Sequence, residues 1–338
     1  MKAAFYYNNQ DIRLGDIPKP KLKDGDLLIK TVSSGICGSD VMEWYRVPKA
    51  PIVLGHEVSG DVVEVGQNVK SFKQGDRVVV SHHVPCNKCE YCKKNLHTAC
   101  DTLRNTNFDP GGFSEFIRIP SINVQTGTFH ISKNISYDEG VFVEPLGCVL
   151  RSQKIANLKT KDNVLVIGAG ISGLLHIKLA LAKGCKKVFA TDINEYRLRK
   201  AKDLGASVVF PGEDVIKFLK ENLDGKLADH VILCTGSTIA LKLSFQCLDR
   251  GGVLQLFAPP PPGHIPEVDL NVIWKEQISI STSYGAAPSD LEEAIHIIES
   301  KKIVVGDMVT HKLSLEEIKQ GFQLVSDAED SLKVIICP

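Results

Sequence analysis

The sequence has no excess of charge of either sign, because 40 Lys and Arg side chains balance 40 Asp and Glu side chains in 338 residues. A chain without net positive charge produces no long-range field that would attract nucleic acid or an anionic membrane surface. We therefore expect neither nucleic acid nor a membrane among its partners.

Long uninterrupted apolar runs are also missing. The longest apolar stretch, residues 164–182, is broken by glycines and contains His176 and Lys178, so it does not match a bilayer-spanning helix. The first residues, Met1–Tyr7, pass directly into strand-like sequence, without the apolar core and cleavage site of a secretory signal. We therefore expect a cytoplasmic protein.

The chain has the composition of a globular protein, with 43% hydrophobic and 24% charged residues, and it is long enough for two domains. Residues 1–147 contain short strand-like runs separated by Gly and Pro, which predicts a mostly β domain of barrel type. Residues 148–284 alternate between strand-like and helical segments, which predicts an α/β domain with a doubly wound parallel sheet of six strands. Residues 285–338 have mixed character and could rejoin the first domain. The expected strands are 27–32, 58–65, 77–80, 113–119, 164–167, 187–191, 208–210, 229–234, 253–257, 278–283 and 333–337, and the prolines of 259–263 predict a loop.

A glycine-rich turn lies near the start of the α/β segment. Gly168, Gly170 and Gly173 match the pattern G-x-G-x-x-G, with Ile171 and Ser172 between the last two glycines. The turn follows an apolar strand and opens a helix, as a dinucleotide-binding loop requires. The helix N-terminus would then face the pyrophosphate of a bound cofactor.

Asp192 ends the next strand, about 20 residues further on, where a carboxylate accepts hydrogen bonds from the adenosine ribose. This carboxylate would repel a 2′-phosphate, so we expect NAD to be preferred over NADP. Arg197 could receive such a phosphate, lie along the adenine or form a surface salt bridge. The alternative for the whole motif is a glycine turn followed by an aspartate that caps a helix.

Four of the ten cysteines are clustered, and the other six are scattered singly. Cysteines this close cannot all form unstrained disulfides, but four thiolates can enclose a tetrahedral zinc ion with no open position, which makes the site structural. Iron remains an alternative on the cysteines alone. His82, His83 and His97 flank the cluster, either as competing ligands or as solvent-facing or locally hydrogen-bonded side chains. The clustered residues are Cys86, Cys89, Cys92 and Cys100.

A second group of possible ligands is spread along the chain. It comprises Cys37, His56, Glu57 and Glu144. One thiol, one imidazole and two carboxylates are the mixture of an open catalytic zinc site, whose remaining position takes water or substrate. On spacing alone, a buried cysteine, a core histidine and a helix-capping glutamate explain the same residues about equally well.

Together these motifs resemble the zinc-dependent medium-chain dehydrogenase/reductase family, which includes the alcohol dehydrogenases. In chain order they are C-G-S-D, G-H-E, C-x-x-C-x-x-C-x₇-C, E-P-L and G-x-G-x-x-G, and they cover essentially the whole chain. The pattern is most similar to the polyol branch, the sorbitol (L-iditol) dehydrogenases, with threonine dehydrogenases as neighbours. The resemblance implies a GroES-like catalytic domain, residues 1–147 rejoined by 285–338, and a Rossmann NAD-binding domain, residues 148–284.

The resemblance also implies roles for particular residues. Cys37, His56 and Glu57 would hold a catalytic zinc ion, and Glu144 would either bind it or hold its water. Ser39 would accept the substrate proton. The four clustered cysteines would hold a structural zinc ion.

The sequence departs from the family pattern at two places that concern the proton and the substrate. Met42 stands where a histidine commonly passes the proton to solvent. Glu43 stands where sorbitol dehydrogenases have an aromatic residue, and Ser283 replaces the arginine of an Arg-Tyr pair that helps to hold the polyol. Of that pair Tyr284 is retained, so we expect it to contact the substrate.

The function expected from the resemblance is reversible, zinc- and NAD-dependent oxidation of a secondary alcohol to a ketone. The substrate would be a small polar alcohol, such as a polyol or cyclitol. The alternatives are a threonine 3-dehydrogenase-like or other amino-alcohol dehydrogenase, a zinc-free reductase of the same superfamily, and a non-catalytic protein that keeps the zinc and NAD sites. We expect a homodimer or homotetramer, since closed symmetric assembly is common among such proteins.

Overall fold

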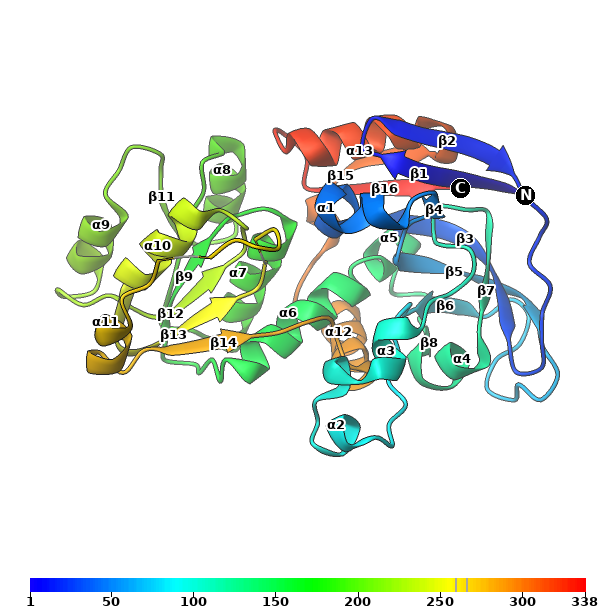
Figure 1. The fold of residues 1–338 in the computed structure, drawn as a ribbon, viewed down its shortest axis with the longest axis horizontal. Coiled ribbons are helices and arrows are strands. Elements are labelled where there is room, and N and C mark those ends of the chain that lie inside the picture. Colours follow the sequence, from blue (N-terminus) through cyan, green and yellow to red (C-terminus); the bar gives the residue numbers. More distant parts are fainter. Residues whose placement is uncertain (259, 266) are drawn as a thin grey trace. The chain divides into compact units, whose positions relative to one another are not determined.

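The two ends of the chain lie in the same folding unit (Figure 1). The structure, a computed structural model, describes residues 1–258, 260–265 and 267–338. Unit 1 comprises Met1–Gly147 and Gly285–Pro338, and unit 2 comprises Cys148–Tyr284. The chain therefore leaves the first unit once and returns to it.

Unit 1 is built mainly on antiparallel strands. Its strands are β1 (Lys2–Asn8), β2 (Asp11–Asp16), β3 (Leu27–Gly35), β4 (Ile52–Val53), β5 (Glu57–Val65), β6 (Arg77–Val80), β7 (Phe116–Ile119), β8 (Thr128–His130), β15 (Val309–Ser314) and β16 (Lys333–Cys337). Its helices are α1 (Glu43–Arg46), α2 (Glu90–Lys93), α3 (Asp101–Asn105), α4 (Ser121–Gly127), α5 (Tyr137–Gly140), α12 (Pro288–Glu299) and α13 (Ile318–Asp327). Helix α6 (Val143–Ile155) continues from unit 1 into unit 2.

One sheet of unit 1 has the strand order β15-β16-β3-β5-β6-β8, with β7 also paired to β3, and a smaller sheet has the order β2-β1-β4. Alternate residues of β3 and β5, such as Leu27, Ile29, Val58 and Val62, share one buried apolar cluster. At the other end of β3, the C-terminal strand β16 pairs with residues 34 and 35. This pairing brings the last residues of the chain beside the residues that begin at Cys37.

Unit 2 contains a six-stranded parallel sheet, which confirms the predicted doubly wound fold. The strand order is β11-β10-β9-β12-β13-β14, so that the first strand of the unit is central. Strand β9 has partners on both sides, and residues 164–167 are all buried, as expected for a continuous apolar run. The strands are β9 (Asn163–Ile167), β10 (Lys187–Thr191), β11 (Ser207–Val209), β12 (Ala228–Leu233), β13 (Leu248–Leu256) and β14 (Ser279–Thr282), and the helices are α7 (Ile171–Lys183), α8 (Glu195–Asp203), α9 (Val215–Asn222), α10 (Thr238–Gln246) and α11 (Leu270–Lys275).

Some element bounds differ from the sequence expectation. The strand expected from residue 113 begins at Phe116, because Ser114 forms only an isolated bridge, with Ala3, and residues 113 and 115 bend on either side of it. Strand β13 begins at Leu248 rather than residue 253. In the predicted proline loop, residue 259 lies outside the described residues, and residues 260–263 form neither helix nor strand.

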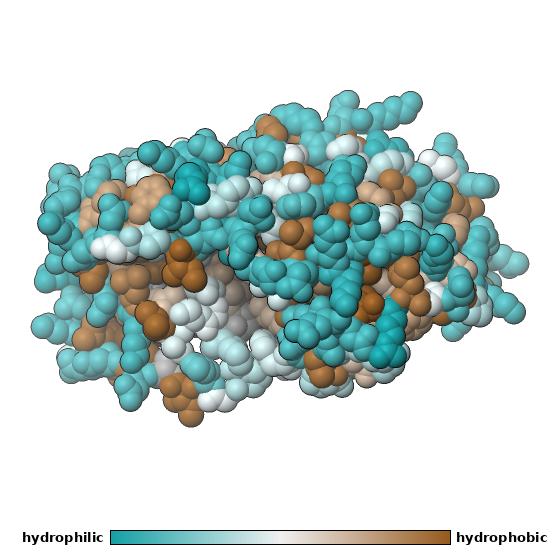
Figure 2. Space-filling view, turned by 90° about the horizontal axis from the view of Figure 1, so that it is seen from above, coloured by the Kyte–Doolittle hydropathy of each residue, from teal (hydrophilic) through white to brown (hydrophobic). Residues whose placement is uncertain are grey.

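The face drawn in Figure 2 is mainly hydrophilic, with hydrophobic side chains in small separate groups. Many large apolar side chains of the described residues are buried in apolar clusters within one unit or the other. Within the described ranges, no helix has both the length and the apolar character needed to cross a bilayer.

Candidate active site and metal centres

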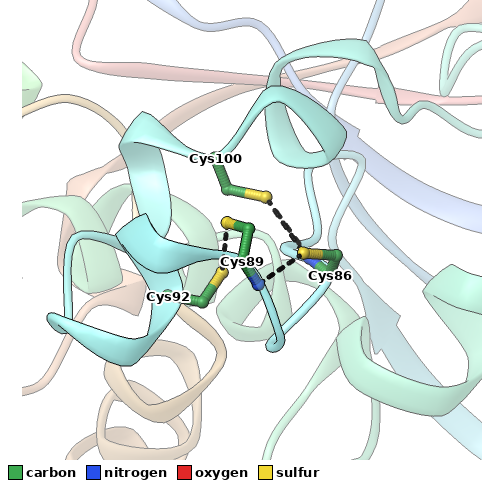
Figure 3. Close-up of side chains that lie close together, drawn as sticks. All are labelled: Cys86, Cys89, Cys92 and Cys100. Atoms are coloured by element: carbon green, nitrogen blue, oxygen red, sulfur yellow. Dashed lines mark hydrogen bonds between the residues drawn. The ribbon is translucent and has the colours of Figure 1, made fainter.

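The four clustered cysteines converge within unit 1, as Figure 3 shows. The sulfurs lie within 4.8 Å of one another, and the Sγ–Sγ distances Cys89–Cys92 and Cys86–Cys100 are both 3.6 Å. Four sulfurs placed about 2.3 Å from a central zinc ion would lie about 3.8 Å apart. The geometry is therefore that of a tetrahedral zinc site without an open position.

Backbone amides support this cluster. The amide of Cys86 donates to Sγ of Cys100, and the amide of Cys89 donates to Sγ of Cys86. Burial opposes ionisation of Cys100, but the amides of Cys86 and Leu103 outweigh it and lower the pKa of Cys100 to about 6. Burial raises the pKa of Cys92 to about 12. The protein thus stabilises part of the negative charge that four thiolates would bring to a metal.

The second ligand group is assembled by pairing of β3 with β5. Glu57 begins β5 and pairs with Gly35, the last residue of β3, and Cys37 follows two residues later. One ligand atom from each of Cys37, His56 and Glu57 lies within 4.8 Å of the others. Gly35 leaves the necessary space, since a Cβ at this position would lie 2.1 Å from Oε2 of Glu57.

Glu57 is held by a buried cation that the sequence analysis did not identify. Nζ of Lys333 lies 2.6 Å from Oε2 of Glu57, and the two side chains are 0% and 1% exposed. Oε1 of Glu57 is buried and has no hydrogen-bond partner among the described residues. A thiol, an imidazole and a carboxylate oxygen with a free ligand position fit a zinc ion with room for a substrate oxygen.

His56 is oriented by the buried Asp40. Nδ1 of His56 lies 3.4 Å from Oδ1 of Asp40, and the amide of Cys37 donates to Oδ2. Burial opposes charge on His56, but the Asp40 carboxylate outweighs it and raises the pKa of His56 well above its ordinary value. With Nδ1 directed at the carboxylate, Nε2 is the nitrogen available to a metal.

The Ser39 hydroxyl contacts an arginine. Arg46, the last residue of α1, donates from Nη2 to Oγ of Ser39 and from Nε to the Ser39 carbonyl, both at 3.0 Å. Nη2 also donates to Oδ1 of Asp40 at 3.0 Å. Met42 precedes α1 and caps it without a side-chain hydrogen bond.

His82 and His83 lie against the second ligand group. The ring centroids of His82 and His56 are 4.8 Å apart, and those of His82 and His83 are 3.8 Å apart. Nδ1 of His83 contacts the carbonyl of Thr106 at 3.0 Å. Burial lowers the pKa of His82 well below its usual value and that of His83 to about 4, so both rings stay neutral near neutral pH.

The glycine loop of unit 2 joins β9 to α7. A Cβ at Gly173 would lie 1.9 Å from the carbonyl oxygen of Gly168, so this close approach requires glycine. Gly170 caps α7 without a side-chain hydrogen bond, and a Cβ there would meet only Arg197, at 3.7 Å. Ile171 and Ser172 are the first residues of the helix. The open space and uncapped helix N-terminus fit the phosphates of a dinucleotide.

Asp192 lies beside this loop. Its carboxylate accepts hydrogen bonds from the amides of Ala169, at 2.5 Å, and Asn194, at 2.8 Å. Among the described residues, the Arg197 guanidinium forms no ion pair, and its buried Nε has no hydrogen-bond partner. The two side chains expected to meet the adenosine end of a cofactor are therefore both near the loop.

The two remaining predicted site residues are Glu144 and Tyr284. Glu144 is in the first turn of α6 and lines a small cavity together with Val80, Ser81 and Leu291. Tyr284 follows β14 at the end of unit 2 and is 49% exposed. Their roles at the metal and the substrate remain predictions.

Two known protein families match parts of this chain. The family described as alcohol dehydrogenase GroES-like domain matches residues 23–126, and the family described as zinc-binding dehydrogenase matches residues 172–300. The chain belongs to the zinc-type alcohol dehydrogenases, a family of oxidoreductases with a GroES-like and a Rossmann-like domain.

Individual relatives match nearly the whole chain. It is 31% identical to a protein named "Probable D-xylulose reductase A" from Aspergillus clavatus, covering 96% of this chain and 93% of that one. It is 28% identical to sorbitol dehydrogenase of Bacillus subtilis (100% and 97% covered) and 30% identical to L-threonine 3-dehydrogenase of Escherichia coli K12 (97% and 96% covered). A zinc-binding dehydrogenase structure from Sinorhizobium meliloti 1021, bound to NADP, has a TM-score of 0.88 at 26% identity, with 100% and 99% covered.

Proposed function

We propose that this protein oxidises a secondary alcohol of a small polar substrate, such as a polyol or cyclitol, to the ketone, with NAD as hydride acceptor. The observation that carries the proposal is the convergence of Cys37, His56 and Glu57 within 4.8 Å, with the Ser39 hydroxyl two residues from Cys37. The reaction is reversible in principle, so the same site would reduce the ketone.

When bound, zinc supplies Lewis acidity that makes the substrate hydroxyl more acidic, and NAD supplies the hydride acceptor. Lys333 holds one oxygen of Glu57 and leaves the other for the metal. Asp40 fixes the His56 ring. Oγ of Ser39 accepts a hydrogen bond from Arg46, and its second lone pair can accept a hydrogen bond from the substrate hydroxyl. When Ser39 takes the substrate proton, its own hydroxyl proton passes to water.

The preference for NAD is proposed from Asp192. Its carboxylate, held by two backbone amides, would accept the ribose hydroxyls of NAD and repel the 2′-phosphate of NADP. Arg197 acts in the opposite direction, because an unpaired guanidinium attracts that phosphate. We expect Asp192→Ala to narrow or reverse the ratio of kcat/KM for NAD to that for NADP. Equal values for both cofactors in the unmutated protein would refute the preference.

We further propose that Glu144 acts at the zinc ion or its water and that Tyr284 contacts the substrate. If Glu144 acts at the metal, Glu144→Gln lowers kcat at least about tenfold with nearly unchanged NAD affinity. If it only interacts with the dipole of α6, the variant keeps normal kcat and loses about 0.3–1 kcal/mol of stability. The two roles are therefore separated by kinetics together with thermal unfolding.

A second candidate is an amino-alcohol substrate. The Escherichia coli relative named L-threonine 3-dehydrogenase supports it, as does Glu43, which stands where sorbitol dehydrogenases have an aromatic residue. A screen of polyols, inositols and amino alcohols, followed by formation of NADH, decides between the candidates. Turnover of one class in the unmutated protein and its loss in Cys37→Ser supports the corresponding function. No NADH from any class in zinc-loaded protein would favour a non-catalytic role.

We also propose a homodimer or homotetramer. Strand β14 ends the parallel sheet of unit 2, and Ile280 on this strand and Trp274 before it are 49% and 77% exposed. An open edge beside exposed apolar side chains is a typical surface for pairing with a second copy.

A further inference from the structure

Hydrogen bonds hold the Arg46 guanidinium in place, but they use only two of its three nitrogens. Three of its hydrogen bonds, from Nε and Nη2, go to Ser39 and Asp40 within unit 1, and its side chain is only 12% exposed. Nη1 makes no hydrogen bond with any described residue. A rigid guanidinium with one free nitrogen is ready to bind an anionic group without further loss of side-chain freedom.

The free nitrogen is close to the reacting hydroxyl position. Nη2 lies 3.0 Å from Oγ of Ser39, and Nη1 is bonded to the same carbon as Nη2. Nη1 therefore lies within about 5 Å of Oγ of Ser39. This distance is short enough for one small molecule to place an anionic group at Nη1 and its alcohol at Ser39.

The charges around the site also favour an anion. The carboxylates of Glu57 and Asp40 are each offset by a cation, Lys333 and Arg46 respectively. A zinc dication and the Cys37 thiolate would then leave one net positive charge. A further cation lies close to Arg46 in the chain: Nζ of Lys49 is 3.8 Å from the centre of the Tyr45 ring, and Cζ of Arg46 is 4.6 Å from the same centre.

One carboxylate near α1 could compete with this interaction. Oε1 of Glu43 accepts a hydrogen bond from the amide of Asn9, in the turn between β1 and β2. Glu43 forms no ion pair with Arg46 or Lys49. Glu43 therefore does not occupy Nη1 of Arg46 or pair with Lys49, and both remain available to a ligand.

We propose that Arg46 is a specificity residue, and that the substrate carries a carboxylate or phosphate roughly one to three carbon atoms from the secondary alcohol. This inference rests on the proposed function and narrows its substrate class. The guanidinium binds the anionic group through Nη1 and keeps Ser39 in position through Nη2.

Binding can be measured without turnover through tryptophan fluorescence. The chain has two tryptophans, Trp44 in α1 and Trp274 in unit 2. In a Trp274→Phe background, emission comes from Trp44 alone, two residues from Arg46. Zinc-loaded protein is titrated with lactate, 3-hydroxybutyrate and glycerol 3-phosphate, each paired with a neutral counterpart: lactamide, 3-hydroxybutyramide and glycerol.

We expect at least one anion to bind about 10–100-fold more tightly than its neutral counterpart, which is the usual range for a charge-assisted hydrogen bond. Arg46→Met should remove this ratio, and Arg46→Lys, which keeps the charge next to the buried Asp40, should keep part of it. The matched control is Arg13→Met, because Arg13 also stacks on a tyrosine, Tyr7, but bonds to Asp11 and not to Ser39.

The outcomes separate this inference from the proposed function. Equal affinity for every anion and its counterpart, no binding of any anion, or an unchanged ratio in Arg46→Met overturns the role of Arg46. Oxidation of neutral polyols without anion binding leaves the proposed function intact and refutes the inference. Anion binding that depends on Arg46, without NADH formation from any alcohol, supports the subsite and refutes the proposed function. A carboxylate-specific or phosphate-specific response identifies which anion the site prefers.

Discussion

The buried pair of Lys333 and Glu57 gives a sharp stability prediction. Lys333→Met keeps the length of the side chain and removes the charge. The carboxylate of Glu57 is 1% exposed and would then lose its only hydrogen-bond donor among the described residues. Removal of one partner of a buried ion pair is far more costly than removal of both, because it leaves an uncompensated charge in the interior.

The expected loss is about 3–5 kcal/mol for the metal-free site. For a unit of this size, we expect the melting temperature of unit 1 to fall by about 6–20 °C. A zinc ion at the site would offer Glu57 a second cation, so the loss should be smaller in zinc-loaded protein. Thermal unfolding, followed by circular dichroism, measures the loss in two backgrounds. The zinc-loaded protein gives the value with metal, and the Cys37→Ser variant gives the value for the metal-free site.

The double variant Lys333→Met/Glu57→Gln is the control. Because it removes both charges, we expect it to recover most of the stability lost in Lys333→Met. If Lys333→Met lowers the melting temperature by less than about 3 °C in the Cys37→Ser background, or if the double variant is less stable than either single one, the reasoning about this pair is wrong.

Three further predictions concern the structural metal, pH and assembly. Cys89→Ser should lower both zinc content and melting temperature, since a closed site contributes metal-binding energy to folding; unchanged values of both would refute the site. Burial lowers the pKa of His176 in α7 to about 3, so the unfolded chain binds a proton that the folded chain does not as pH falls below about 6.5. Stability should therefore decrease as the pH is lowered, and His176→Gln should remove about 1.6 kcal/mol of the loss between pH 6.5 and 5 in urea unfolding; identical pH profiles would contradict this. Light scattering should give at least twice the 37.0 kDa chain mass, and Ile280→Lys on β14 should give a monomer, whereas a monomeric unmutated protein would refute assembly.

The fold of unit 2 could be predicted from the sequence because its signals are local. Strand β9 is a continuous apolar run, and the glycine turn and helix α7 follow it at once. Much of unit 1 lacks such signals. Strand β2 carries charged and half-exposed residues, and β4 has only two residues, so neither could be recognised by periodicity.

The candidate ligands could be predicted because they stand in short sequence motifs. The residues that contact them could not, because only the folded chain brings them close. Cys37, His56, Glu57 and the four clustered cysteines stand in short patterns. Lys333 meets Glu57 across 276 residues, because β16 returns to pair with β3. Arg46 reaches Ser39 only because the chain turns between η1 (Gly38–Val41) and α1, which no periodic pattern marks.

The central claim is that Cys37, His56 and Glu57 hold a catalytic zinc ion distinct from the one held by the four cysteines. Elemental analysis of metal-replete protein tests it most directly. We predict two zinc ions per chain in the unmutated protein and one in Cys37→Ser, because the two ligand groups are separate and only one of them changes. A single zinc ion per chain in both proteins would contradict the account.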